Sequence, residues 1–184
     1  MRRGPAGATH RVKILLVSGS TRSGSTNSAL IRTAARSAPA GITTEVYPGI
    51  ELLPHFNPDL DGPPVPPAVE SLRAAIEASD AVLFCTPEYA GTLPGSFKNL
   101  LDWTVGATAL TGKRVAWVNA AADGRRGSGA HATLATVLGY VQASIVEDAC
   151  RHVPVPRESV GADGLIHDDA TRAAISDVLR ALVG

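Results

Sequence analysis

Cysteine is scarce in this sequence. Cys85 and Cys150 are the only two among 184 residues. Two cysteines are too few for the disulfide framework of a small secreted protein, and they lack the C-x-x-C spacing of a metal or redox pair. We therefore expect two reduced thiols, no bound metal and a cytoplasmic protein.

The sequence also has no excess of either positive or negative charge. The 17 Lys and Arg residues balance the 17 Asp and Glu residues, so the formal net charge at pH 7 is zero. A protein that holds nucleic acid by counterion release needs a basic surface, which this composition does not provide. We expect no nucleic-acid partner.

Long apolar runs are absent as well. No run approaches the roughly 20 residues of a membrane-spanning helix, and no apolar segment follows the basic start "MRRGPAGATHR" as in a secretory signal. We expect no membrane contact. Residues 1–11 are predicted to form a disordered tail, and residues 12–184 a single domain of ordinary size.

Short apolar runs alternate with segments of helical period in the rest of the chain. Strands are predicted at residues 12–18, 43–48, 80–87, 113–120 and 144–150. Helices are predicted at residues 27–38, 68–79, 95–105, 129–141 and 168–183. The proline-rich residues 52–67 predict a long loop, because proline lacks the N–H that a helix or sheet needs.

This alternation favours a parallel sheet covered by helices on both faces. Five strands in one α/β domain indicate a flavodoxin-like three-layer sandwich with a five-stranded parallel sheet in the order 2-1-3-4-5. In that order a ligand crevice lies at the carboxyl ends of the first and third strands. The loops 18–26 and 86–95 are the first candidates for a site, and 119–129 is the next.

The first of these loops reads "GSTRSGSTN", residues 19–27. It ends a strand and opens a helix, with Thr26 or Asn27 as the expected N-cap, so backbone N–H groups and the positive helix end converge there. The sequence nearly matches the triphosphate loop G-x-x-x-x-G-K-[ST], but Ser25 replaces the lysine, and Thr21 breaks the dinucleotide pattern G-x-G-x-x-G. We interpret it as a monophosphate site with donors from Ser20, Thr21, Arg22, Ser25, Thr26 and Asn27.

Two other interpretations of this loop exist. Its polar residues can simply form a turn and a helix cap, and that alternative stays open. A low-molecular-weight phosphatase would need a cysteine with an arginine six positions later. Gly91 and Pro156 occupy those positions after the two cysteines, which excludes that activity.

The second loop lies within "TPEYAGTLPGSFKNLLDW", residues 86–103. Proline stiffens it, its glycines allow close approach of a ligand, and Tyr89 offers a flat apolar face with a polar tip. Taken alone it could also be a rigid turn. It lies where a planar ring would sit if a phosphate were bound on the first loop.

Together the two loops resemble the NADPH-dependent FMN reductase family, flavodoxin-like proteins that include quinone, azo-compound and chromate reductases. "GSTRSGSTN" is similar to the family's G-S-x-R-x-x-S-x-N, and "PEYAGTLPGSFKNLLDW" to its P-E-Y-N-x-x-x-P-G-x-x-K-N-x-x-D-W. The resemblance covers residues 12–146. It implies an FMN phosphate site at Ser20, Arg22, Ser25, Thr26 and Asn27. It implies ring contacts from Pro87, Glu88, Tyr89, Ala90 and Gly91.

The sequence departs from the family pattern in two places. Ala90 replaces the usual Asn, which removes an amide near the flavin. The third loop, residues 119–131, is glycine-rich but lacks the family pattern, so it receives no assigned contacts. Arg125 and Arg126 in it could meet the 2′-phosphate of NADPH or form a solvated charge pair.

The resemblance implies an oxidoreductase that passes hydride from NADPH, with NADH possible, through bound FMN to a small acceptor such as a flavin, quinone, azo dye or metal oxyanion. The flavin carries the chemistry, so we expect no catalytic side chain. The alternative is a flavodoxin-type electron carrier without direct NADPH oxidation. Zero net charge speaks against it, since such carriers are usually strongly acidic.

The resemblance also implies an oligomer. In such proteins the helix predicted at residues 95–105 pairs between subunits to complete the pocket, which implies a homodimer or a dimer of dimers. Phe97 and Trp103 are then expected near the flavin edge, and burial of both side chains within one chain is the alternative.

Overall fold

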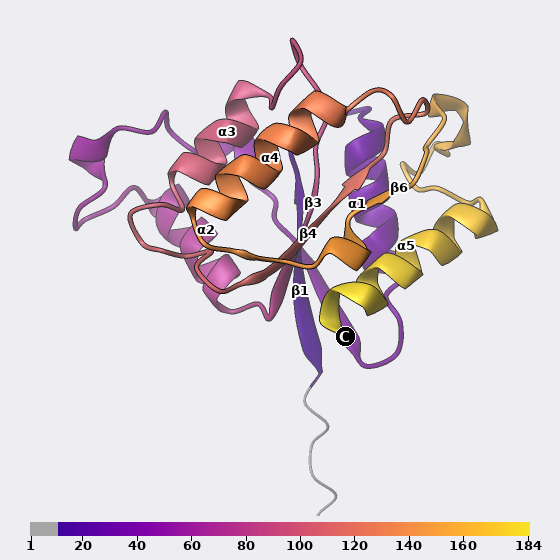
Figure 1. The fold of residues 1–184 in the computed structure, drawn as a ribbon, viewed down its shortest axis with the longest axis horizontal. Coiled ribbons are helices and arrows are strands. Elements are labelled where there is room, and N and C mark those ends of the chain that lie inside the picture. Colours follow the sequence, from indigo (N-terminus) through magenta and orange to yellow (C-terminus); the bar gives the residue numbers. More distant parts are fainter. Residues whose placement is uncertain (1–10) are drawn as a thin grey trace, which may run out of the picture.

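The computed structural model describes residues 11–184, whose centre is a parallel sheet (Figure 1). The predicted N-terminal tail lies outside the described residues except for Arg11. The sheet has the order β2-β1-β3-β4-β5, which confirms the predicted topology. Its strands are β1 (Val12–Ser18), β2 (Ile42–Val46), β3 (Ala81–Cys85), β4 (Arg114–Asn119) and β5 (Ser144–Ile145).

The edge of the sheet beside β4 differs from the prediction. The prediction of a continuous strand over residues 144–150 is wrong, because β5 ends at Ile145 and a 3-10 turn follows at Glu147–Ala149. A sixth strand, β6 (Arg151–His152), then pairs with β4 again. Ile145 pairs with Val115, whereas Arg151 pairs with Val118. The edge chain is therefore longer than the stretch of β4 beside it, and the turn takes up the excess.

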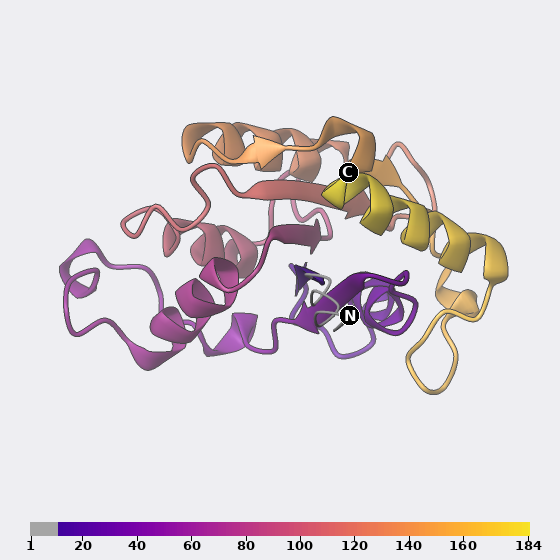
Figure 2. The same cartoon turned by 90° about the horizontal axis from the view of Figure 1, so that it is seen from below.

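Five helices cover the two faces of the sheet, as predicted for a three-layer sandwich. Figures 1 and 2 show α2, α3 and α4 together on one side and α1 and α5 on the other. Their bounds are α1 (Thr26–Arg36), α2 (Pro67–Glu77), α3 (Gly95–Asp102), α4 (Ser128–Tyr140) and α5 (Asp169–Val183). No helix within residues 11–184 combines the length and apolar character needed to cross a bilayer.

Alternation along β1 divides the hydrophobic core in two. Ile14 and Leu16 face α1 and α5, whereas Leu15 and Val17 face the other three helices. All four side chains are buried. Successive strand residues point to opposite faces, so a continuous apolar run such as "ILLV" is what a strand covered on both sides requires.

The proline-rich segment, residues 52–67, is docked on α3. Asn99 accepts a hydrogen bond from the Phe56 N–H at 2.7 Å and donates to the Pro54 carbonyl at 2.9 Å. The Trp103 indole donates to the same carbonyl at 2.8 Å, and its ring meets the Phe56 ring edge-on at 4.9 Å between centroids. The segment also contains a 3-10 turn at Pro58–Leu60, and the predicted loop lies between a 3-10 turn at Ile50–Leu52 and α2, which begins at Pro67.

The expected positions of Phe97 and Trp103 at a flavin edge need correction. Both side chains are fully buried within the chain. Trp103 lies under the proline-rich segment, and Phe97 packs edge-on against Phe84 with centroids 5.6 Å apart. Both side chains pack in the hydrophobic core, so neither is available as a contact between subunits.

A tight hairpin turn follows β3. Tyr89 and Thr92 exchange backbone hydrogen bonds of 2.9 and 3.1 Å, and the two residues between them both have positive φ, +50° at Ala90 and +78° at Gly91. Two successive positive φ values define a type I′ turn, for which Asn-Gly is the favoured pair. The turn geometry therefore explains why the family pattern has Asn at this position. In this chain Ala90 adopts the left-handed conformation with strain.

We predict that Ala90→Asn stabilises the protein by about 0.5–1 kcal/mol, because asparagine tolerates the left-handed conformation better than alanine. The free energy of unfolding in urea measures the effect. Ala122→Asn is the matched control, since Ala122 is also an exposed loop alanine but is not among the residues with positive φ. An Ala90→Asn variant no more stable than the control would contradict the proposed strain.

Candidate functional site

Three loops at the carboxyl ends of the strands surround one cavity of about 570 Å³. We name them loop 1 (residues 19–25, after β1), loop 2 (86–94, after β3) and loop 3 (120–127, after β4). The volume is within the range of roughly 300–1,000 Å³ that small-molecule sites occupy. The residues that line the cavity are Ser20, Arg22, Ser25, Thr26, Asn27, Thr86, Pro87, Glu88, Tyr89, Asn119, Ala121, Arg126 and Gly127.

Most of the predicted site residues meet in this cavity. Of the donors predicted in loop 1 and the start of α1, all but Thr21 line it, and so do Pro87, Glu88 and Tyr89. Ala90 and Gly91 do not line it, because they form the exposed tip of the hairpin turn. The sequence did not indicate Thr86, Asn119, Ala121 or Gly127, and it left the role of Arg126 in loop 3 open. The one available signal was a glycine-rich stretch after a buried strand.

Loop 1 packs closely against loop 2. The Gly19 N–H donates to the Cys85 carbonyl at 2.8 Å, which continues the β1–β3 pairing into the loops. A Cβ at position 19 would clash with the Thr86 hydroxyl and would lie 3.0 Å from the Phe97 ring. Glycine is therefore required at this position for the first two walls of the cavity to approach each other.

The start of α1 differs from the prediction. The N-cap is Ser25, with an extended backbone, and neither Thr26 nor Asn27 fills that role. Thr26 and Asn27 already lie within the helix, and the Asn27 Oδ1 accepts a hydrogen bond from the Cys85 thiol at 3.2 Å. Among the described residues no side chain caps the first turn of α1. The positive end of this helix is thus free to meet an anion in the cavity.

Arg22 supplies a cation at the rim of loop 1. The residue is exposed, its backbone N–H donates to the Ser20 hydroxyl at 3.3 Å, and its guanidinium donates to the Gly24 carbonyl at 3.0 Å. The bond to Gly24 folds the side chain back over its own loop. Its charge is therefore held beside the uncapped end of α1.

Glu88 joins loop 2 to α4. Its carboxylate accepts hydrogen bonds from the Gly129 N–H at 2.7 Å and the Ala130 N–H at 3.2 Å. These are first-turn groups of α4, whose own N-cap residue Gly127 offers no side chain. Glu88 therefore satisfies the helix end and places its negative charge where the helix dipole favours it.

Gly129 completes the contact between loop 2 and α4. A Cβ at this position would clash with the Gly91 carbonyl oxygen and would lie 3.0 Å from the Glu88 Oε2 atom. The hairpin turn therefore rests directly on the backbone of the first turn of α4.

Asn119 organises loop 3. Its amide donates to the Arg126 carbonyl at 2.8 Å and accepts from the Ala121 N–H at 3.0 Å. Gly127 has a φ of +89°, and a Cβ there would lie 2.8 Å from the Asn119 Oδ1 atom. His152 on β6 holds the Ala121 carbonyl at 2.7 Å from its Nε2 atom. The third wall of the cavity is thus fixed from both β4 and β6.

The titratable groups near the cavity are poorly suited to acid–base or nucleophilic roles. Burial raises the pKa of the Cys85 thiol far above its ordinary value, so the nucleophilic thiolate is not formed at neutral pH. Burial lowers the pKa of His131, and the Glu88 carboxylate only partly offsets this, so the ring is neutral at pH 7. The His131 ring stacks on Trp117.

The described part of the chain also shows no metal-binding site. Residues 11–184 contain no group of three or more His, Cys, Asp and Glu side chains placed to hold a metal ion.

Comparison with known proteins agrees with this geometry. Residues 12–154 match the family model of NADPH-dependent FMN reductases. An NAD(P)H-dependent FMN reductase of Pseudomonas aeruginosa is 35% identical over 174 residues, which cover 93% of each chain. A probable NADPH:quinone oxidoreductase of Oryza sativa is 30% identical over 178 residues, covering 93% of this chain and 87% of the relative.

A solved structure is also similar along nearly the whole chain. It is the flavoenzyme NAD(P)H:(acceptor) oxidoreductase FerB of Paracoccus denitrificans, which superposes with a TM-score of 0.74 at 28% identity. The match covers 94% of this chain and 95% of that one. The family match spans loops 1, 2 and 3, which form the cavity. The chain belongs to the NADPH-dependent FMN reductase family.

Proposed function

We propose that this protein is an FMN-dependent NAD(P)H oxidoreductase that reduces a small acceptor such as a quinone, a flavin, an azo dye or a metal oxyanion. One observation carries the proposal. The uncapped end of α1, the Arg22 guanidinium and the rigid loop 2 converge on a single cavity of about 570 Å³.

Loop 1 suits the phosphate of FMN. The first-turn N–H groups of α1 have no capping side chain among the described residues, so a phosphate at this helix end gains both their hydrogen bonds and the helix dipole. The hydroxyl groups of Ser20 and Ser25 lie in the cavity wall, and Arg22 adds a charge-assisted contact at the rim. Thr26 and Asn27 complete the phosphate site.

Loops 2 and 3 suit the flavin ring. Pro87, Glu88 and Tyr89 form one wall, and the Tyr89 side chain, with a relative exposure of 53%, presents a flat face beside the open mouth. Ala90 and Gly91 act indirectly by forming the turn that holds Tyr89. Because Glu88 and Asn119 fix these walls, the ring would enter a preformed slot.

When bound, FMN supplies the transfer of hydride from the nicotinamide to the acceptor. The chain contributes binding and orientation. Loop 1 anchors the phosphate, loops 2 and 3 border the ring, and the open mouth admits the nicotinamide and then the acceptor. The buried Cys85 and the neutral His131 agree with the absence of an acid–base or nucleophilic role.

Three further features belong to the proposal. Residues 12–184 form one domain, the protein acts in the cytoplasm, and it works as a homodimer or dimer of dimers. The free thiols of Cys85 and Cys150 suit a reducing compartment. Exposed apolar side chains at Val105 and Tyr140, beyond α3 and at the end of α4, suit contact with a second copy.

The decisive experiment is anaerobic reduction of the FMN-loaded protein. We expect the purified protein to take up FMN and NADPH to bleach the bound flavin without an added reductase. A subsequent quinone should restore the flavin absorbance. Failure to take up FMN would overturn the proposal. Flavin that binds but is bleached by neither NADPH nor NADH would identify a flavodoxin-type carrier instead.

We predict that Arg22→Ala weakens FMN binding about tenfold or more, because a hydrogen bond to a charged group contributes roughly 1.5–3 kcal/mol. Fluorescence titration of FMN measures the dissociation constant, and circular dichroism checks the fold. Arg36→Ala is the control, since Arg36 is an exposed arginine at the opposite end of α1. Unchanged FMN affinity in the Arg22 variant would remove this side chain from the phosphate site.

We predict that Gly129→Ala weakens FMN binding, because the new Cβ pushes the Gly91 carbonyl and Glu88 away from α4. Overpacking of this kind costs about 1–3 kcal/mol in unfolding free energy. Gly139→Ala in the same helix is the matched control, since a Cβ there meets nothing within 4 Å. The control should gain about 0.5–1 kcal/mol and keep its FMN affinity. Equal behaviour of the two variants would show that loop 2 does not depend on this contact.

A further inference from the structure

Two adjacent arginines on loop 3 have different surroundings. Arg125 has a side-chain exposure of 92% and pairs with Asp123, whose carboxylate it meets at 3.2 Å. The hydrogen bonds from Arg125 lower the pKa of Asp123, and the charge of Arg126 contributes to a smaller extent. Arg126 lines the cavity, and among the residues that the structure describes no carboxylate lies within ion-pair distance of its guanidinium. One charge is therefore neutralised on the surface, and the other remains available at the cavity.

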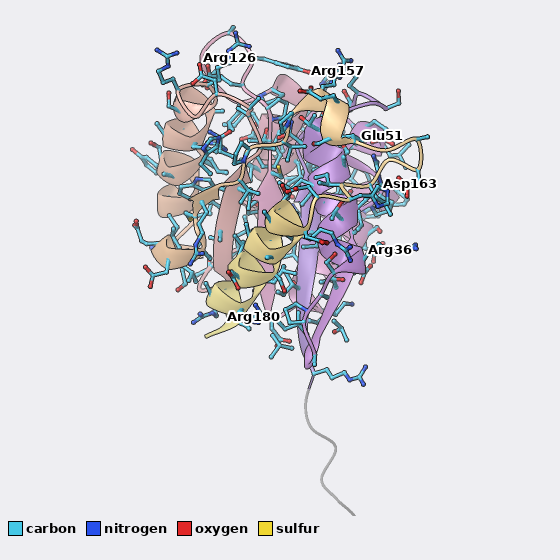
Figure 3. All side chains as sticks on the ribbon, turned by 90° about the vertical axis from the view of Figure 1, so that its right-hand side faces the viewer. Arg36, Glu51, Arg126, Arg157, Asp163 and Arg180 are labelled. Carbon is cyan, nitrogen blue, oxygen red and sulfur yellow. The ribbon has the colours of Figure 1, made fainter. Side chains whose placement is uncertain are left out.

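The backbone that carries Arg126 is held in place. Its N–H donates to the Asp123 carbonyl at 2.9 Å, and its carbonyl accepts from the Asn119 amide at 2.8 Å. Figure 3 shows Arg126 at the upper end of the molecule, beyond the start of α4. A fixed backbone with an unpaired guanidinium is preorganised for an anionic group, since little order has to be imposed on binding.

The charges around the cavity leave room for a second anion. Arg22 and Arg126 are its two lining cations, and Glu88 is its one lining carboxylate in the described part of the chain. Glu88 is already engaged by the N–H groups of α4. Loop 1 follows β1 and loop 3 follows β4, with β3 between them. Two strand spacings, about 10 Å, therefore separate β1 and β4, the strands from which loops 1 and 3 start.

We propose that Arg126 binds the 2′-phosphate of NADPH and makes the enzyme prefer NADPH to NADH. The inference rests on the proposed function, in which the FMN phosphate occupies loop 1 and leaves Arg126 unpaired. NADPH carries a 2′-phosphate that NADH lacks, and a guanidinium is well matched to a phosphate dianion. Arg126 is thus a specificity-determining residue.

Paired variants of the two arginines provide the test. We expect Arg126→Ala to lower the ratio of kcat/KM for NADPH to kcat/KM for NADH about tenfold or more, mainly through a higher KM for NADPH. Arg125→Ala should leave that ratio within about twofold, since its exposed pair contributes little. Arg126→Lys should recover part of the preference, because lysine keeps the charge and loses the fork geometry.

Ligand binding without turnover gives an independent readout. Calorimetry with the FMN-loaded protein should show 2′,5′-ADP binding about tenfold or more tightly than 5′-AMP, and Arg126→Ala should remove the difference. An unchanged cofactor ratio in Arg126→Ala would overturn the inference. So would a wild-type protein with no preference between the two nucleotides. A loss of FMN affinity with an unchanged ratio would place Arg126 on the flavin phosphate instead.

The test separates this inference from the proposed function. If the wild-type protein takes up FMN and oxidises NADPH while Arg126→Ala keeps the wild-type ratio, only the inference fails. If the wild-type protein takes up no FMN, or its bound flavin is bleached by neither dinucleotide, the proposed function fails, and the inference fails with it.

Discussion

The contact between the Glu88 carboxylate and the first turn of α4 determines how the site is built. Two helix N-termini adjoin the cavity, those of α1 and α4. Glu88 occupies the second through the N–H groups of Gly129 and Ala130. The positive end of α1, which has no capping side chain in the described chain, is therefore the one left for a ligand. The same bonds fix loop 2 against α4. The Glu88 carboxylate therefore leaves the α1 terminus as the place for a ligand anion, and it also positions the cavity wall that would border the flavin ring.

Glycine completes this arrangement where the walls meet. Gly19 lets loop 1 approach loop 2, Gly129 lets loop 2 rest on α4, and Gly127 lets loop 3 close over Asn119. Each position lacks room for a Cβ, so the three loops are braced against one another and against the strands. Flexible loops would lose conformational freedom when a ligand binds, and bracing them in advance removes much of that cost.

The sequence was sufficient to predict those parts of the structure that depend on residues close together in the chain. Continuous apolar runs predicted β1, β3 and β4, the alternation of strands and helices predicted the strand order, and the loop that opens α1 predicted the cavity at the carboxyl ends of β1 and β3. It was insufficient where distant residues decide the outcome. The Asn27 amide bonds to the Cys85 thiol, 58 positions away in the chain, and not to the backbone of its own helix end. Asn119 and Gly127 act together only after loop 3 has folded, and the edge chain pairs with β4 in two short stretches, β5 and β6, with a 3-10 turn between them.

The motif after β3 combines two separate constraints. Its first half, residues 87–91, borders the cavity and forms the turn. Its second half, on α3, includes Asn99 and Trp103, which bind the proline-rich segment through the Pro54 carbonyl. Because α3 begins directly after loop 2, anchoring this helix to the segment on its far side also fixes where loop 2 ends. The long motif therefore marks a connected unit in which a buried tryptophan supports the cavity without touching it.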